Sequence, residues 1–337
     1  MLHVTCYMKK IVFSAVQPSG ALHIGNYLGA IKNWVELQKN YRCIFCIADY
    51  HAITLKQNPR ILKKKIFELV CIYLSADINP KKSIIFVQSQ VPYHTELAWI
   101  LNCITKISEL KRMTQFKQKS KEHPEKVNVG LFDYPVLMAS DILLYQTDLV
   151  PVGKDQKQHI ELTRSLARRF NKEFGKTFKI PKALIKKQSE KIMGLDNPLK
   201  KMSKSAEDPY NYIALTDTPK LIREKIKKAI TDSGKEIKYD KEKKPGISNL
   251  LTIYSLLSKK SIPQLENQYK NKTYAEFKKD LAEVIIKSLT PFQEKLKYYQ
   301  SKPEYVKNIL EQGRKKAEKI SQATIKEAKK KLGLLCS

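Results

Sequence analysis

The sequence predicts an α/β fold in which a Rossmann-like parallel sheet is followed by an α-helical C-terminal domain. Short apolar runs alternate with amphipathic stretches through the first half of the chain, a pattern typical of βαβ units and a parallel sheet. From about residue 215 the strand signals fade, and helical periodicity with many lysines replaces them. At 337 residues the chain has room for two domains of ordinary size.

The first half predicts three strands and three helices in alternation. We expect the strands near residues 10–16, 42–48 and 83–88, where β-branched and aromatic residues gather. We expect the helices over residues 24–39, 59–76 and 93–105, where apolar residues recur at helical spacing. Right-handed crossovers should make the three strands parallel.

The next segments extend this pattern and then end it. "YPVLMASDILLYQ" predicts a helix with Pro135 in its first turn, "DLVPVG" a strand, and "KDQKQHIELTRSLARRF" a long helix just after Gly153. Helical periodicity then marks "TPKLIREKIKKAI", "GISNLLTIYSLLS", "TYAEFKKDLAEVIIKSL" and the long tail that begins "QEKLKYYQ". We therefore expect a catalytic domain over residues 1–194 and a helical domain over 195–337, whose last helix packs back on the first domain.

The charge balance points to a polyanionic partner. Lys and Arg number 63 against 33 Asp and Glu, a formal net charge of +30, which favours nucleic acid. The alternative is a compositional bias toward lysine. No apolar run approaches the ~20 residues that span a bilayer, and the first apolar run breaks at Gln17-Pro18, short of a secretory signal. We expect a cytoplasmic protein that does not bind membranes.

The six cysteines predict neither disulfides nor a metal site. Cys43 and Cys46 form a C-x-x-C pair, but they lie in an apolar segment that indicates a buried strand. No second close pair completes a zinc site, so we expect buried, reduced thiols and no protein-bound metal.

The segment "AVQPSGALHIGNYLGAI", residues 15–31, places an unusual turn between the first strand and the first helix. The N-terminus of such a helix is a natural anion site, and Gly20 and Gly25 let the backbone approach a phosphate closely. His23 and Asn26 add short donors at the same point. A tight turn with an incidental histidine is the alternative.

The segment "LKKMSKSAEDP" supplies a second candidate for phosphate chemistry. It places Lys201, Ser203, Lys204 and Ser205 within five residues. Ammonium groups and hydroxyls on a mobile loop suit a developing phosphoryl charge. An exposed lysine-rich loop is the alternative, but both motifs together in this order favour nucleotide chemistry.

Together the two motifs resemble the signatures of class I aminoacyl-tRNA synthetases. "HIGN" has Asn26 where the general pattern has His, a variation usual in tryptophanyl-tRNA synthetases. The stretch "GLFDYPVLMASDILLYQTDLVPVGKDQKQHIELTR", residues 130–164, is similar to that family, as are "IMGLDNPLKKMSKS" and "GRKKAEKI". The resemblance to the bacterial type covers almost the whole chain.

The resemblance implies ATP-dependent ligation of L-tryptophan to tRNA(Trp) through a tryptophanyl-adenylate, with release of AMP and pyrophosphate. It implies ATP with Mg²⁺ on its phosphates, and a homodimer. The implied ATP-binding residues are Gln17, Pro18, Ser19, Gly25, Asn26, Gly153, Lys154, Asp155, Ile192, Lys201, Met202, Ser203, Lys204 and Ser205. The implied catalytic residues are Lys201, Lys204, His23, Asn26 and Lys119.

Tryptophan selection needs one hydrogen-bond acceptor in an apolar pocket, because indole offers one N–H donor and a large apolar face. Asp141 is the only carboxylate in "PVLMASDILLYQ", and on a helix it shares a face with Tyr134 and Met138. A salt-bridged or capping aspartate is the alternative reading of Asp141. The resemblance implies that Asp141 accepts the indole N–H, and Phe13, His51 and Gln156 match further pocket positions.

Three other functions compete with this interpretation. A tyrosyl-tRNA synthetase shares the fold and both signatures, but it needs a pair of groups that read a hydroxyl. A small-molecule adenylyltransferase uses a similar turn, but such chains are shorter and lack a large helical second half. An RNA-binding module with a decayed active site would not keep His23, Asn26, Asp141, Lys201 and Lys204 together.

Overall fold

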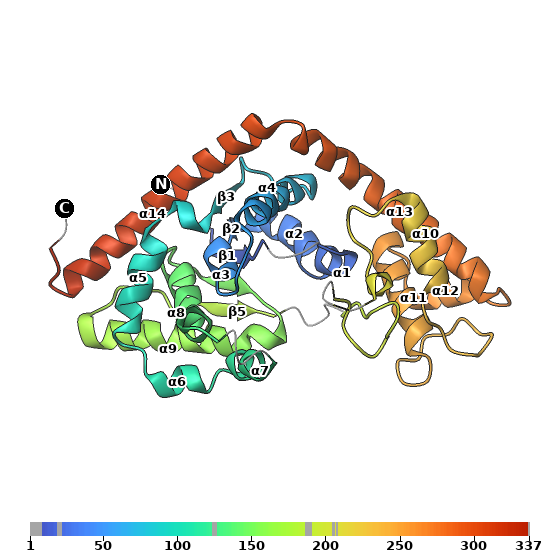
Figure 1. Cartoon of the computed structure of the whole chain (residues 1–337), viewed down its shortest axis with the longest axis horizontal. Coiled ribbons are helices and arrows are strands. Elements are labelled where there is room, and N and C mark those ends of the chain that lie inside the picture. The colour runs from blue at the N-terminus through green and yellow to red at the C-terminus, as the bar shows by residue number, and fades with distance from the viewer. Residues whose placement is uncertain are drawn as a thin grey trace, which may run out of the picture.

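The computed structural model describes residues 9–18, 22–122, 127–185, 191–203, 206 and 208–335. Within these residues five parallel strands form one sheet in the order β3-β2-β1-β4-β5 (Figure 1). The strands are β1 (Ile11–Val16), β2 (Arg42–Ile47), β3 (Ser83–Val87), β4 (Leu149–Pro151) and β5 (Lys182–Leu184). The chain order reverses between β1 and β4, where such sheets hold ligands beyond the carboxyl ends of the strands. The predicted Rossmann-like class is confirmed.

Helices occupy most of the remaining chain. Those of the first half are α1 (Ile24–Asn26), α2 (Lys32–Asn40), α3 (Asp49–Ala52), α4 (Pro59–Ser75), α5 (Tyr93–Asn102), α6 (Ile107–Lys111), α7 (Thr114–Glu122), α8 (Val129–Leu143) and α9 (Lys157–Phe174). Those of the second half are α10 (Pro219–Lys228), α11 (Pro245–Ser258), α12 (Ile262–Gln268), α13 (Tyr274–Gln300) and α14 (Pro303–Lys331).

The two faces of the sheet bury different hydrophobic clusters. Val12, Phe45 and Ile47 point into one cluster with residues of α2 and α4. Phe13 and Ile44, their neighbours along the strands, point into the other cluster with residues of α5, α8 and α9. This alternation follows from the two-residue period of a strand.

Two predicted helices differ from the structure. The helix expected over 24–39 is interrupted between α1 and α2 by a π-helical turn, Tyr27–Ile31, which apolar spacing alone cannot distinguish from an α-helical turn. Helix α8 begins at Val129, because the Asn128 side chain caps it by accepting from the Leu131 N–H at 2.9 Å. Pro135 therefore lies inside the helix, and the prediction of Pro135 in the first turn was wrong.

The C-x-x-C pair is split between the two faces of the sheet. Cys43 belongs to one cluster and Cys46 to the other, because residues three apart on a strand point in opposite directions. Burial raises the pKa of Cys43 to about 12 and the pKa of Cys46 well above its ordinary value. Both thiols are free and buried, as is Cys71, whereas Cys103 is exposed against expectation. Cys6 and Cys336 lie outside the described residues.

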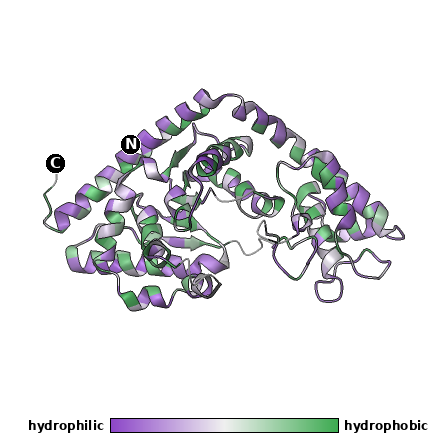
Figure 2. Cartoon of the chain, viewed as in Figure 1, coloured by the Kyte–Doolittle hydropathy of each residue, from purple (hydrophilic) through white to green (hydrophobic). Residues whose placement is uncertain are grey.

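The last helix returns to the first half of the molecule. Figure 1 shows α13 rising from the helical half on the right to the top of the view, from where α14 runs down to the left and packs on β3 and α5. Its buried positions include Gly313, Ala317 and Ser321, and small side chains let the helix lie close to the edge of the sheet. Figure 2 shows that the rest of this helix is largely hydrophilic. Among the described residues, no helix is long and apolar enough to cross a membrane.

Candidate active site

The turn after β1 is built by its own signature residues. The Asn26 side-chain oxygen accepts from the His23 backbone N–H at 3.1 Å, and the Asn26 N–H donates to the His23 carbonyl at 2.9 Å. These bonds start α1 just beyond the carboxyl end of β1. Gln17 lies in the same turn, whereas Ser19 is outside the described residues.

Gly25 is required because the backbone passes close to the His23 ring. A Cβ at residue 25 would lie 2.9 Å from His23 Nδ1 and 3.5 Å from the Cβ of Ile192. His23 is 5% exposed and tilts against Tyr212, with ring centroids 6.1 Å apart. The glycine thus lets the turn pack directly against His23 and Ile192.

The lysine-bearing loop is held beside this turn by backbone pairing. Met193 and Lys201 form an antiparallel bridge, and the Met202 N–H donates to the Ile192 carbonyl at 3.0 Å. From α11, the Asn249 amide both donates to and accepts from the Met193 backbone, each at 2.9 Å. Lys204 and Ser205 lie outside the described residues.

Two cavities that share Asn26 and Lys201 lie between the turn and the loop. The first, of about 440 Å³, is also lined by Gln17, His23, Met202 and Ser203. The second, of about 480 Å³, is also lined by Gly25, Gly153, Asp155, Gln156 and Ile192. Most of the residues predicted to bind ATP therefore line one or both of these cavities.

Pro18 is not among the residues that line these two cavities. Pro18 lines a separate recess of about 160 Å³ between α4 and α13. Lys154 begins the 3₁₀ turn after Gly153 and Lys119 belongs to α7, but the side chains of both lie outside the described part of the chain.

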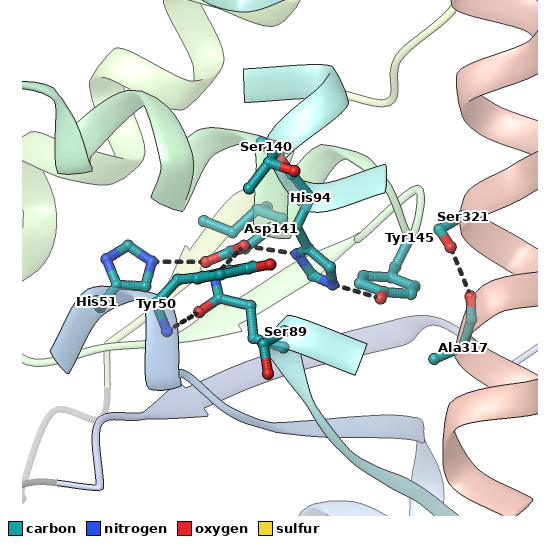
Figure 3. Close-up of polar contacts among 12 residues, drawn as sticks. Tyr50, His51, Ser89, His94, Ser140, Asp141, Tyr145, Ala317 and Ser321 are labelled. Atoms are coloured by element: carbon teal, nitrogen blue, oxygen red, sulfur yellow. Dashed lines mark hydrogen bonds and ion pairs between the residues drawn. The ribbon is translucent and has the colours of Figure 1, made fainter. Parts of the chain in front are cut away.

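Asp141 lies at the centre of a buried polar network (Figure 3). Its Oδ1 accepts from Gln88 Nε2 at 2.7 Å and from His94 Nδ1 at 2.6 Å, and its Oδ2 accepts from His51 Nε2 at 2.8 Å. Asp141 is 1% exposed. Burial acts to raise the pKa of its carboxyl, but hydrogen bonds from His51 and His94 outweigh burial and hold the pKa well below its usual range. Asp141 is thus a buried, ionised acceptor.

The other predicted pocket residues lie at different depths and at different places relative to the Asp141 network. On α8, Tyr134 and Met138 are half-buried, and the Tyr134 hydroxyl lies 3.0 Å from His159 Nε2. The ring of Tyr134 meets His51 edge-on, with centroids 6.2 Å apart. Phe13 is deeper and stacks on Tyr145 at 5.4 Å. Gln156 lines the second cavity and donates to Asp155 at 2.9 Å, so it lies beside Gly153 and Asp155, which are predicted to bind ATP.

Sequence reasoning missed Gln88, His94 and Tyr145, which complete the network around Asp141. Gln88 directly follows β3, and a polar residue at the carboxyl end of a parallel strand is a recognisable signal. His94 and Tyr145 lie in apolar stretches and carried no such signal.

A Rossmann-like sheet, a His23–Asn26 turn over its first helix and a Lys201–Ser203 loop facing that turn define a class I aminoacyl-tRNA synthetase. The model of the family "tRNA synthetases class I (W and Y)" matches residues 8–290, and the chain belongs to this family.

Several relatives share this similarity over nearly the full length. The chain is 53% identical over 327 residues to the tryptophan--tRNA ligase of Helicobacter pylori, covering 97% of this chain and 99% of the relative. A solved tryptophanyl-tRNA synthetase from Mycoplasma pneumoniae superposes with a TM-score of 0.88 at 37% identity, covering 97% of this chain and 99% of that one. The Campylobacter jejuni synthetase complexed with ADP and tryptophan has a TM-score of 0.84 at 36% identity, covering 96% and 100%.

Proposed function

We propose that this protein ligates L-tryptophan to tRNA(Trp) at the expense of ATP, through a tryptophanyl-adenylate. The observation that carries the proposal is Asp141, a buried and ionised acceptor on the same face of α8 as Tyr134 and Met138. A single acceptor among apolar and aromatic side chains suits an indole N–H. The cavities beside Asn26 and Lys201 supply room for the nucleotide.

In the first step the tryptophan carboxylate attacks the α-phosphorus of ATP, an O–P bond forms, and pyrophosphate leaves with the electrons of the broken bond. The protein binds and orients both substrates, and positive groups stabilise the charge that develops on the phosphoryl oxygens. Lys201 and the predicted Lys204 fill this role. His23 and Asn26 shape the turn that lines the first cavity opposite Lys201.

Mg²⁺ fits this site as a companion of the nucleotide. The first cavity is lined by amide, imidazole, hydroxyl and ammonium groups and by apolar side chains. That lining contains no Asp or Glu carboxylate, the kind of ligand that Mg²⁺ prefers in proteins. The phosphate oxygens would therefore hold the ion, which would neutralise part of their charge.

In the second step a hydroxyl of the 3′-terminal ribose of tRNA attacks the activated carbonyl and releases AMP. Because tRNA is a long polyanion, it needs an extended basic surface that leads to this site. The lysine-rich helices after residue 195 suit its phosphates. We assign residues 195–337 to tRNA binding and residues 1–194 to catalysis. This reaction draws on ATP and tRNA, from which we infer a cytoplasmic location.

A homodimer is part of the proposal, and an exposed apolar patch is its candidate interface. Trp99, Ile107 and Val129 are 71%, 65% and 80% exposed. Their helices α5, α6 and α8 are neighbours, and the Asn128 side chain ties the start of α8 to Thr54, beside exposed Ile53. Large exposed apolar side chains on neighbouring helices are candidates for an interaction surface.

Sedimentation velocity tests this interface. Trp99→Glu combined with Val129→Glu should convert the dimer to monomer, because two charges per subunit would be buried without partners. The control is Ile230→Glu, which changes an apolar residue that is 50% exposed in the helical half. A dimer that survives the double change would place the interface elsewhere.

ATP–pyrophosphate exchange with each of the twenty amino acids tests the function. Exchange with tryptophan alone supports the proposal. Exchange with tyrosine would identify a tyrosyl-tRNA synthetase of the same family. Exchange with no amino acid would favour an adenylyltransferase or a non-catalytic RNA-binding protein.

A further inference from the structure

The hydrogen bonds to the Asp141 carboxylate use all but one of the four lone pairs on its two oxygens. Each carboxylate oxygen offers two lone pairs. Oδ1 uses both, for Gln88 and His94, whereas Oδ2 receives one bond, from His51, among the described residues. The remaining lone pair lies on Oδ2. The donors on Oδ1 therefore decide which oxygen faces a ligand.

His94 can hold Oδ1 only in one tautomer. An ionised carboxylate accepts hydrogen bonds and donates none, so the proton of His94 must lie on Nδ1, 2.6 Å from Oδ1. In the neutral ring, Nε2 is then an acceptor, and it lies 2.8 Å from the Tyr145 hydroxyl. His94 and Tyr145 are both fully buried, so water does not compete for these positions. The Tyr145 O–H thus fixes the tautomer that donates to Asp141.

The network extends toward the last helix of the chain. Tyr145 follows α8, and Ser321 of α14 lies near its hydroxyl. Ser321 is fully buried and donates to the Ala317 carbonyl at 2.9 Å. Figure 3 shows the order of these side chains, from His51 and Asp141 through His94 and Tyr145 toward α14. Three helices distant in sequence therefore meet at this chain of polar groups.

We propose that His94 and Tyr145 are positioning residues for indole recognition: Tyr145 sets the tautomer of His94, and His94 occupies Oδ1 so that Oδ2 of Asp141 faces the indole N–H. This inference rests on the proposed function, in which Asp141 receives that N–H. It predicts that both residues increase the preference for substrates with an indole N–H, although neither residue contacts the substrate.

The test compares tryptophan with 3-benzothienylalanine, which has the same shape but carries sulfur in place of the N–H. The ratio of kcat/KM for the two amino acids in pyrophosphate exchange measures recognition of the N–H. Tyr145→Phe should lower this ratio by about tenfold, as expected when a buried hydrogen bond is removed. Tyr73→Phe is the matched control, because the Tyr73 hydroxyl is fully buried and has no hydrogen-bond partner among the described residues.

Two variants of His94 separate positioning from packing. The amide nitrogen of Asn lies near the position of Nδ1, so His94→Asn should keep most of the ratio. The amide of Gln lies near the position of Nε2 and not of Nδ1, so His94→Gln should lower the ratio. A purely structural role would lower kcat/KM for both amino acids by the same factor, leave the ratio unchanged in Tyr145→Phe and His94→Gln, and overturn the inference.

Asp141→Ala separates this inference from the proposed function. If Asp141→Ala leaves the ratio at the wild-type value, Asp141 does not read the N–H, and the proposed pocket itself is wrong. If Asp141→Ala lowers the ratio to about one while Tyr145→Phe and His94→Gln keep the wild-type ratio, Asp141 still reads the N–H and only the positioning role fails.

Discussion

At the scale of single residues, Lys201 is a cation that lines both cavities of the candidate site. Its backbone is fixed by the bridge to Met193, while its side chain is exposed to solvent. This combination leaves the ammonium group able to approach a phosphoryl oxygen when negative charge develops there. An interaction of this kind acts on the transition state more than on the ground state.

Lys201→Ala should lower the rate of adenylate formation by about 10²-fold and leave the KM for tryptophan nearly unchanged. Single-turnover kinetics with tryptophan and ATP measure both quantities. The matched control is Lys200→Ala, which removes the adjacent exposed lysine. Equal losses in the two variants would mean that overall charge, rather than the position of Lys201, matters.

Asp141 should also give the folded protein an acid dependence. Its pKa is lowered on folding, because hydrogen bonds from His51 and His94 outweigh the effect of burial. The unfolded chain therefore binds the proton more readily, so the contribution to stability is present above the ordinary pKa of about 3.9 and is lost as the pH falls below it.

Urea unfolding between about pH 5 and pH 3 measures this contribution. The free energy of unfolding of the wild type should fall more steeply with decreasing pH than that of Asp141→Asn, which cannot titrate. Asp49→Asn is a suitable comparison, because Asp49 is also buried and hydrogen-bonded, to Ser89. Parallel curves for the wild type and Asp141→Asn would show that the carboxyl keeps its unfolded pKa.

At the scale of elements, the signature turn is joined to the helical half by paired backbone. The Ile24 N–H donates to the Ile213 carbonyl at 2.9 Å, and the Leu215 N–H donates to the Leu22 carbonyl at 3.0 Å. A buried ion pair of 2.7 Å between Asp217 and Lys225 anchors this segment to α10. Movement of the helical half would therefore displace the turn that precedes α1.

The packing of α14 on β3 depends on Gly313. A Cβ at this position would lie 1.8 Å from the Ile85 carbonyl oxygen, which belongs to β3. Gly313→Ala should lower the free energy of unfolding by about 1–3 kcal/mol, because the helix must move away from the edge of the sheet. Urea unfolding measures this decrease. Gly29→Ala, where nothing lies within 4 Å of the added Cβ, should have a much smaller effect, and equal effects would contradict the close packing at Gly313.

At the scale of the whole molecule, the net charge of +30 should attract a polyanion from a distance. Part of this charge lies on the outer side of α14, where Lys316, Lys319 and Lys330 are exposed. Lys329 differs from them, because it pairs with Glu96 of α5 at 3.0 Å and helps to hold the helix in place. The exposed lysines are therefore the ones to test for RNA binding.

Reversal of Lys316, Lys319 and Lys330 to Glu should weaken tRNA binding and leave tryptophan-dependent exchange intact. The log–log dependence of affinity on salt should also flatten, by about 0.7 to 0.9 for each phosphate that the protein no longer neutralises. A filter-binding titration over a range of salt concentrations measures both effects. The control reverses Lys56, Lys63 and Lys64, which are exposed near and on α4 and give the same change in net charge. Equal effects of the two triple variants would show that net charge, and no surface on α14, governs binding.

The sequence by itself determined the features that depend on short-range patterns. Alternating apolar strands and amphipathic helices gave the order of the sheet-forming half, and the turn at His23–Asn26 and the loop at Lys201 were visible as compact motifs. Asp141 was visible as a lone carboxylate in an apolar helix, but its role as the indole acceptor was predicted from the resemblance to tryptophanyl-tRNA synthetases. Each of these signals lies within a few residues along the chain, where backbone geometry fixes which side chains share a face.

Only the tertiary structure decided how Asp141 is held. Gln88, His94 and Tyr145 come from the end of β3, from α5 and from the segment after α8. Gln88 carries a local signal, but no local pattern predicts that the three meet at Asp141. The π-helical turn after α1 and the position of Pro135 inside α8 were likewise set by surroundings and capping rather than by periodicity. The physical reason is that a buried polar group must find partners in three-dimensional space, and packing of distant elements, rather than local spacing, provides them.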